Sequence, residues 1–295
     1  MRVPLTPLLL GATLLASACS PLTRYRQSLF TPAAAPTTVI GAPIPDGQLG
    51  VAAHVSGYWV DDWLTNEDNL SGYFPREGDP GLFMSPISVG GHLRWGVSDS
   101  VELGASFDYA SATWASRSSV GVLPLADNAS LLSIGPEITV GHMFGAFGFG
   151  STLEAAWTQL PWSQYEYVGP GDWEDYTMLG DAQDLYELQG TGVCHPWRLR
   201  WTNAFQIRKE AFDSAIGFTL AQQLTNVGFS DEQEPVYEGG PVAVIPVMDL
   251  GFTVPGVHVG VQMWWAANAA GATNDLYNGL GARLVMEYRT PQREE

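Results

Sequence analysis

Residues 257–265 read Val257-His258-Val259-Gly260-Val261-Gln262-Met263-Trp264-Trp265, and this stretch decides the fold. Every odd-numbered residue in it is apolar, whereas the even-numbered positions carry an imidazole, a glycine, an amide and a tryptophan. Successive side chains of a β-strand point to opposite faces, so a period of two indicates a strand with one apolar face. The same alternation returns at 279–289 and at 196–208, where Asn203 is the one polar residue on the apolar face.

This alternation predicts about ten strands along the chain, each long enough to cross a hydrocarbon core at a steep tilt. The strands lie near 49–59, 86–96, 101–112, 131–141, 146–158, 196–208, 211–222, 242–253, 257–267 and 279–289. Short links occur at 96–100, 142–145, 209–210 and 254–256, and long polar segments at 60–85, 113–130, 159–195, 223–241 and 268–278. Long and short links therefore alternate, as in outer-membrane barrels with short periplasmic turns and longer external loops.

We therefore predict an all-β fold. It is a transmembrane antiparallel up-and-down β-barrel of about ten strands. The barrel covers residues 47–290, and a short C-terminal tail follows at 291–295. An even strand count places both ends of the barrel in the periplasm. The outward aromatic residues then form two girdles, Trp59, Tyr109, Trp157, Trp197 and Trp265 near the external rim and Trp95, Phe147, Phe212, Phe252 and Tyr288 near the periplasmic rim.

A soluble, lipid-anchored β-barrel is the alternative fold, because such barrels also alternate and also use glycine and aromatic residues. Its apolar face would point inward, and its second face should be a water-facing surface rich in Lys and Glu. Here the second face is mainly Gly, Ala, Ser and Thr with scattered charges, and Lys209 is the only lysine in the chain. This composition favours the membrane barrel.

The first residues have the pattern of an export signal: Arg2 supplies positive charge, a short apolar run follows at 8–15, and Ala16-Ser17-Ala18 precede Cys19. The segment resembles the lipobox of bacterial lipoproteins, in which the cysteine is acylated and becomes the new N-terminus. The resemblance implies a signal peptide at 1–18 and a palmitate-bearing anchor at Cys19, and Ser20 after the cysteine implies sorting to the outer membrane. An ordinary secretory signal cleaved near Ala18 is the alternative, and both readings export the protein.

Residues 20–46 are rich in Pro, Ala and Thr and show no sustained periodicity. We predict that 19–46 is a lipid anchor followed by a tether, which holds the protein on the periplasmic side of the outer membrane with its loops external. Lipidation of Cys19 would leave Cys194 without an intramolecular partner, since the chain has two cysteines. A Cys19–Cys194 disulfide is the alternative, and the two readings exclude each other.

Charged residues make up 15% of the chain, and the formal net charge is −18. This balance argues against nucleic acid as a partner, because nucleic acid is bound by basic surfaces. It also argues against a basic patch that binds anionic lipid. Outer-membrane lipid around the barrel is the one partner that the predicted fold itself implies.

Twelve charged residues lie on the second face of the strands and would line the lumen. A barrel of about ten strands encloses little space, so we expect these charges to pair and plug the interior. The alternative is a narrow channel for small solutes, whose walls hold both signs of charge. The twelve residues are Arg94, Glu102, Asp108, Glu137, Glu154, Arg198, Arg200, Arg208, Asp213, Asp249, Arg283 and Glu287.

The net negative charge belongs to the predicted external loops. The third loop interleaves acids with aromatic residues, and its centre reads Asp172-Trp173-Glu174-Asp175-Tyr176. These five residues are the candidate binding groups for divalent cations or for a cationic or carbohydrate ligand outside the cell. A solvated charged surface is the other interpretation. The spacing matches no EF-hand loop.

An enzyme of the outer membrane is the last alternative. The predicted barrel resembles the omptin proteases in architecture, and Asp61-Asp62 resembles their Asp pair, but no Asp-x-His sequence occurs. His195 beside Cys194 is a weak nucleophile–base candidate, because adjacent strand residues point to opposite faces. We assign no catalytic residue, no metal site and no cofactor. We expect a non-enzymatic barrel with a binding or structural role, with a rim-active hydrolase as the alternative.

Overall fold

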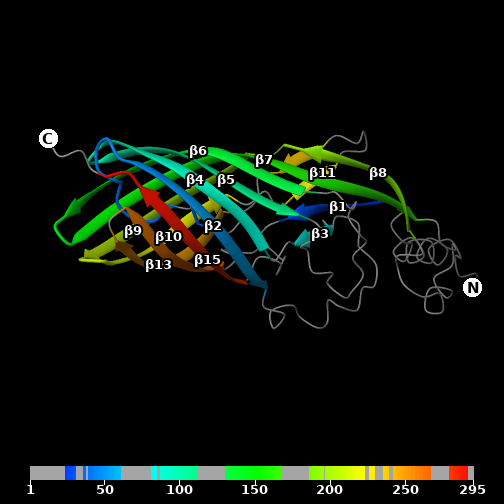
Figure 1. Ribbon diagram of the computed structural model, residues 1–295. Helices are drawn as coiled ribbons and strands as arrows, with labels where there is room; N and C mark the ends of the chain where they lie inside the picture. Colours follow the sequence, from blue (N-terminus) through cyan, green and yellow to red (C-terminus); the bar gives the residue numbers. More distant parts are fainter. Residues whose placement is uncertain are drawn as a thin grey trace, which may run out of the picture.

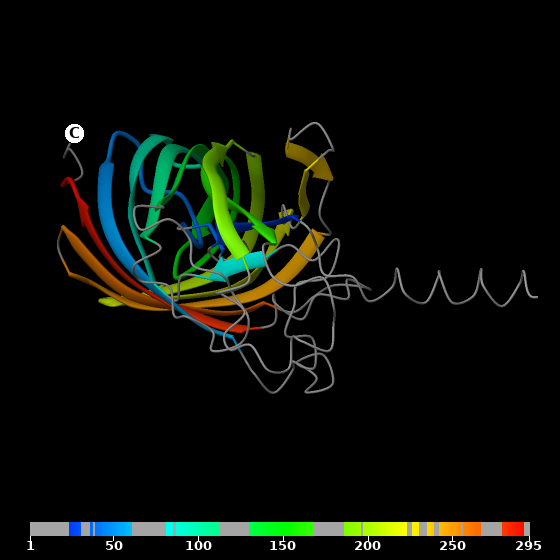
Figure 2. The same ribbon diagram turned by 90° about the vertical axis from the view of Figure 1, so that its right-hand side faces the viewer.

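Ten strands form a closed antiparallel barrel (Figures 1 and 2). The computed structural model describes residues 24–30, 36–37, 39–60, 81–84, 87–111, 130–167, 186–195, 197–222, 226–229, 235–238, 242–254, 256–266 and 279–291. The barrel strands are β2 (Leu49–Val60), β4 (Ile87–Ser98), β5 (Val101–Ser111), β6 (Ser130–Phe144), β7 (Phe147–Tyr167), β9 (Trp197–Lys209), β10 (Phe212–Gln222), β13 (Val242–Val254), β14 (Val257–Ala266) and β15 (Gly279–Arg289).

Each barrel strand pairs with the next barrel strand along the chain, and the last strand, β15, pairs with the first, β2, from Gly279–Val60 to Arg289–Gly50. The predicted all-β up-and-down barrel of about ten strands is therefore confirmed. Nine of its strands begin and end within three residues of the predicted bounds, and β7 is the exception. No helix among the described residues is long and apolar enough to cross a membrane.

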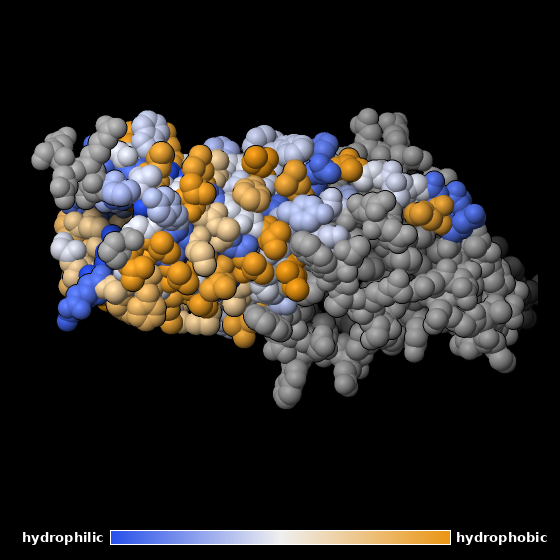
Figure 3. Space-filling model, in the orientation of Figure 1, coloured by the Kyte–Doolittle hydropathy of each residue, from blue (hydrophilic) through white to orange (hydrophobic). Residues whose placement is uncertain are grey.

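The two faces of the barrel wall differ sharply. On β15, Leu284 is 54% exposed on the outside, whereas its neighbour Val285 is 3% exposed on the inside. Across the wall the outward side chains are large and apolar, and the inward ones are mostly polar, charged or small. On the face seen in Figure 3, apolar residues lie over much of the barrel wall. The soluble alternative requires the opposite arrangement, so the apolar outer face identifies a membrane barrel.

The short links between strands all lie at one end of the barrel, called here the short-turn end. Gly145 and Glu210 both have positive φ, 66° and 54°, in two of these turns. Glycine adopts this conformation without strain, whereas Glu210 does so at a cost of about 1 kcal/mol. The end of the barrel chain lies here too, because the Thr290 amide donates to the carbonyl of Leu49 at 2.9 Å.

At the opposite, long-loop end, β7 runs on past the barrel. The predicted strand ends at residue 158, but β7 continues to Tyr167 and pairs there with β8 (Tyr186–Cys194). The third predicted loop is thus partly a projecting hairpin. Two short strands from the fourth predicted loop at 223–241, β11 (Asn226–Phe229) and β12 (Pro235–Glu238), form a small sheet of their own.

The N-terminal part of the chain also lies at the long-loop end. β1 (Arg24–Phe30) pairs antiparallel with the outer part of β7, and parallel with β3 (Gly81–Met84). Both short strands lie at the mouth of the barrel in Figures 1 and 2. β1 thus lies at the long-loop end, whereas a tether on the predicted periplasmic side would lie at the short-turn end. The predicted signal peptide at 1–18 and Cys19 lie outside the described residues.

Residues 36–37 and 39–46, called here the plug, lie inside the barrel. They belong to the segment that the sequence predicts as a tether at 19–46. Thr37, Val39, Ala42 and Ile44 are buried against the inner wall. The part of the predicted tether next to β2 is therefore an ordered filling of the lumen.

Candidate functional site: the filled lumen

The twelve charged residues predicted for the second face all come from barrel strands and all point into the barrel. Eleven are buried, and Arg208 is partly exposed. Strand pairing decides which of them meet, because neighbouring strands bring residues that are far apart in sequence side by side. Their charges gather in three groups, which lie at different positions in the lumen.

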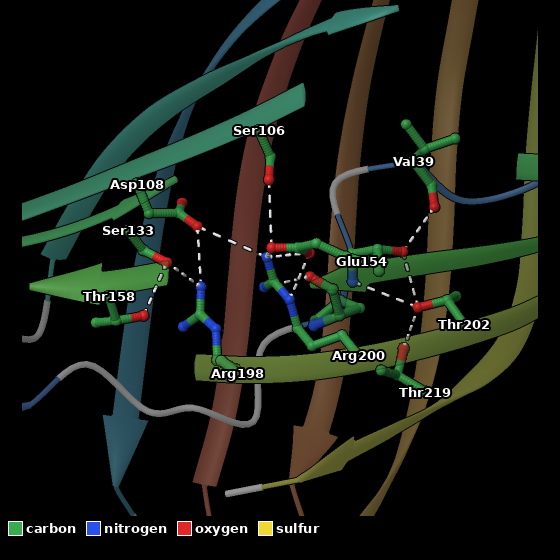
Figure 4. Close-up of polar contacts among 12 residues, drawn as sticks. Val39, Ser106, Asp108, Ser133, Glu154, Thr158, Arg198, Arg200, Thr202 and Thr219 are labelled. Carbon is green, nitrogen blue, oxygen red and sulfur yellow. Dashed lines mark hydrogen bonds and ion pairs between the residues drawn. The ribbon is translucent and has the colours of Figure 1, made fainter. Parts of the chain in front are cut away.

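The first group surrounds Arg200 (Figure 4). It lies in the half of the lumen nearer the long-loop end, because Arg200 is three residues after Trp197, where β9 begins. Glu154 and Arg200 are direct cross-strand partners on β7 and β9, and the guanidinium Nε donates to Glu154 Oε2 at 2.7 Å. Asp108 accepts an ion pair from Arg198 at 3.5 Å. Its other oxygen is 2.8 Å from His54 Nε2. Opposite charges in this region therefore offset one another, as buried charges require.

The second group lies nearer the short-turn end and is centred on Arg94. Its guanidinium donates to Glu102 Oε1 from Nε at 2.7 Å and to Glu102 Oε2 from Nη2 at 2.6 Å, a bidentate pair. Arg94 Nη1 also donates to Glu287 at 3.1 Å, and Arg289 holds the second oxygen of Glu287 at 2.7 Å. Two acids and two bases are thus joined in one network.

The third group comprises side chains of β9, β10, β13, β14 and β15. Arg208 Nε donates to Asp213 at 3.1 Å, and the Gln262 amide donates to Asp249 at 2.9 Å. Arg283 donates to Gln262 Oε1 at 3.1 Å, and its guanidinium lies 5.3 Å from the ring centre of Trp264. This position over an aromatic face is a favourable one for a cation.

Glu137 differs from the other acids. It pairs across the strands with Glu154 and is buried, yet neither of its carboxyl oxygens has a hydrogen-bond partner among the described residues. A buried polar group without a partner costs free energy. Glu137 therefore lowers the stability of the first group.

The plug completes these networks. The carbonyl of Pro36 accepts from Arg200 Nη1 at 3.0 Å and from Arg283 at 3.5 Å. The Ala42 amide donates to Gln206 Oε1 at 2.8 Å, and the Ile44 amide donates to Glu102 at 2.9 Å. Charged and amide side chains of the wall thus satisfy the backbone of a segment that has no secondary structure of its own.

Hydroxyl groups fasten the other side of the plug. Thr37 Oγ1 lies 2.8 Å from Thr202 Oγ1. Thr202 Oγ1 in turn lies 2.6 Å from Thr219 Oγ1 (Figure 4). At the short-turn end the Gly47 amide donates to the carbonyl of Gly96 at 2.9 Å. The plug is therefore held along its length.

The wall has no room for side chains where the plug passes closest. A Cβ placed on Gly150 would overlap the carbonyl of Gly41, and one on Gly96 would overlap the carbonyl of Pro45. Glycine at these positions allows backbone to approach backbone. The plug and the wall are thus fitted to each other.

The described residues leave a small cavity beside the plug. A cavity of about 30 Å³ lies between the plug and the wall, lined in part by His92, Asp249 and His258. Such a volume holds about two water molecules. The predicted charges do face one another across the described lumen, but no pattern in the sequence indicated the plug, which supplies much of the filling.

The candidate loop-binding residues Asp172, Trp173, Glu174, Asp175 and Tyr176 lie outside the described residues. The two strands that flank them are described: β7 ends at Tyr167, and β8 begins at Tyr186. His195, the weak candidate for a base, stacks on Trp157 with ring centres 4.7 Å apart. Within the part of the chain that the structure describes, no three His, Cys, Asp or Glu side chains gather as a metal site would need.

No known protein family and no curated protein matches the sequence. Among solved structures, the chain is similar to the translocator domain of autotransporter NalP from Neisseria meningitidis, with 11% identity and a TM-score of 0.42 over 84% of this chain and 90% of that one. It is also similar to the outer membrane protease OmpT from Escherichia coli, with 11% identity and a TM-score of 0.33 over 85% and 96%. A third is LpxR from Salmonella typhimurium, with 8% identity and a TM-score of 0.33 over 81% and 99%. These are likenesses of shape, and the architecture of this chain rests on its own strand pairing and facing.

Proposed function

We propose that this protein is an outer-membrane barrel with a closed lumen, which holds a binding platform at the cell surface and conducts no solutes. The observation that carries the proposal is the plug. It occupies the lumen, and Arg200, Gln206 and Glu102 from the wall hydrogen-bond to its backbone. The cavity of about 30 Å³ beside the plug is by itself too small to serve as a solute path.

An outer-membrane location is supported by the outward apolar band and by the aromatic residues at its borders. Trp197 and Trp265 are exposed near the long-loop end, and Phe147, Phe252 and Tyr288 near the short-turn end. Aromatic residues of this kind sit at the level of lipid headgroups. The predicted export signal at 1–18 and the acylated Cys19 fit the same location.

The platform is the projecting part of β7 with β8, β1 and β3 beside it. β7 continues ten residues past Trp157, from 157 to 167, which is about 33 Å along the strand. The segment with Asp172, Trp173, Glu174, Asp175 and Tyr176 joins the two strands of this hairpin. We infer that the hairpin presents these acids and aromatic residues to a divalent cation or to a cationic or carbohydrate ligand.

Electrical conductance in planar bilayers tests the closed lumen. The wild-type protein should be silent. Gly150→Leu should conduct, because a side chain at this position collides with the plug at Gly41. Gly190→Leu is the matched control, since a Cβ at Gly190 meets nothing within 4 Å. Heat-modifiable migration on gels should report a folded barrel for all three proteins.

A steady open conductance of the folded wild-type protein would refute the closed lumen and favour the narrow channel. Equal silence of wild type and Gly150→Leu would show that the wall charges close the barrel without the plug. Ligand binding is tested separately, by calorimetry with Ca²⁺ and with basic peptides, in wild type and in a variant with Asp172, Glu174 and Asp175 changed to Asn and Gln. Equal heats in both would remove these acids from the proposal.

A further inference from the structure

The chain passes through its own barrel. At the short-turn end, the amide of Asp46 lies 3.3 Å from Asp99 Oδ1 in the turn between β4 and β5. Going backwards along the chain, Ala42 meets Gln206, and Pro36 meets Arg200, which lies three residues from Trp197 at the long-loop rim. The described plug therefore runs from one end of the barrel almost to the other.

β1 continues the same path beyond the rim. Ser28 pairs with Trp162, and Arg24 pairs with Glu166, so the strand leads away from the barrel as it is followed toward its first residue. Its antiparallel direction relative to β7 is the one that a chain entering the lumen from the long-loop end must have. The pairing and the plug thus give the same direction independently.

The chain before β1 is too short to return to the other side. Arg24 is opposite Glu166, which is nine residues beyond Trp157 (166 − 157) and so about 30 Å further along the strand. Arg24 is the fifth residue after Cys19, so the two are at most about 18 Å apart. The far leaflet lies a further hydrocarbon thickness of about 25 Å below the rim. Cys19 cannot reach it while the plug stays in place.

We propose that the barrel carries its own N-terminal segment through the lumen to the long-loop side, so that a lipid on Cys19 enters the leaflet on that side. Under the proposed function, on which this inference rests, that leaflet faces the outside of the cell. The near leaflet is within reach, because a strand tilted by about 40° rises only about 23 Å over the same 30 Å of length. The five-residue link and the acyl chains cover that height.

Epitope accessibility on intact cells tests this topology. A short epitope inserted between Leu22 and Thr23 should be bound by antibody without permeabilisation, as should one between Asp172 and Trp173. An epitope added after Glu295, on the side of the short turns, should be bound only after permeabilisation. An epitope at Leu22 that behaves like the one at Glu295 in a folded barrel would overturn the proposal.

A disulfide tests the plug in the same cells. A Cβ built on Gly148 lies 3.3 Å from the Cβ of Ala42, close to the separation of about 3.8 Å found in disulfides. Ala42→Cys with Gly148→Cys, in a Cys194→Ser background, should cross-link nearly completely and shift the denatured protein on non-reducing gels. The pair Ala42→Cys with Gly190→Cys should not cross-link.

The two proposals fail in different ways. A silent barrel whose Leu22 epitope is shielded would refute the path of the chain and leave the closed lumen standing. A conducting barrel whose Leu22 epitope is exposed and whose cross-link forms would refute the closed lumen and leave the path standing. Absence of the cross-link in a folded barrel would overturn the path by itself.

Discussion

Replacing Arg200 by methionine tests the charge network of the lumen most directly. Arg200 holds Glu154 across β7 and β9, and it also donates to the plug at Pro36. Methionine has nearly the same length and no charge. The substitution therefore leaves Glu154 buried without its cation and removes one hydrogen bond from the plug.

The expected loss follows from these contacts. Breaking a buried ion pair by removing one partner costs about 3–5 kcal/mol, because the remaining charge is left uncompensated. Arg200→Met should lower the free energy of unfolding by this amount. In Arg200→Met with Glu154→Gln, no charge is stranded at this pair, so the double variant should recover about half of the loss or more.

Urea unfolding of the protein in phospholipid vesicles, followed by tryptophan fluorescence and by heat-modifiable migration, measures these free energies. Glu154→Gln by itself completes the double-mutant cycle. If the losses of the two single variants simply add in the double variant, Arg200 and Glu154 do not interact, and the pairing described for the lumen is refuted.

Three other changes test the remaining features. Leu284→Arg should destabilise the barrel by about 2–4 kcal/mol in the same urea assay, because it puts a charge on the lipid face; the inward Val285→Thr should cost clearly less, and the reverse order would invert the facing of β15. Glu137→Gln should be neutral or stabilising, since Glu137 has no hydrogen-bond partner among the described residues; a loss above about 2 kcal/mol would mean that its charge is needed. Metabolic labelling with palmitate should mark the wild type and not Cys19→Ser, and equal absence of label would remove the lipid anchor.

The strands could be predicted from the sequence because each of them faces two different surroundings. Lipid outside and a polar lumen inside impose a period of two, and Leu284 beside Val285 shows the contrast at one step along β15. Glycines on the inner face follow the same logic. Gly281 has no side chain, and the ring of Trp264 fills the space beside it. A glycine on the second face can therefore be required by packing as well as by polarity.

The plug could not be predicted, because the same polar wall surrounds it on every side. No periodicity arises in such a segment, and its partners are far away in sequence, as with Thr37 and Thr202, 165 residues apart. The outer part of β7, after residue 158, could not be predicted for a related reason. Above the rim there is no lipid on one face, and residues 159–167 pair with β8 and β1 without the alternation that marks the barrel.

The pairing of β15 with β2 has a consequence for the order of assembly. This seam joins the first barrel strand, which directly follows the plug, to the last strand of the chain. Where the plug passes Gly150 and Gly96, the wall has no room even for a Cβ atom, so a folded or acylated segment cannot enter along this path after the ring has closed. The ring must therefore close around a chain that already lies inside it. The pairing of the C-terminal strand, β15, with β2 is the step that closes it. A chain truncated before Gly279 would lack the strand that closes the ring around the N-terminal segment.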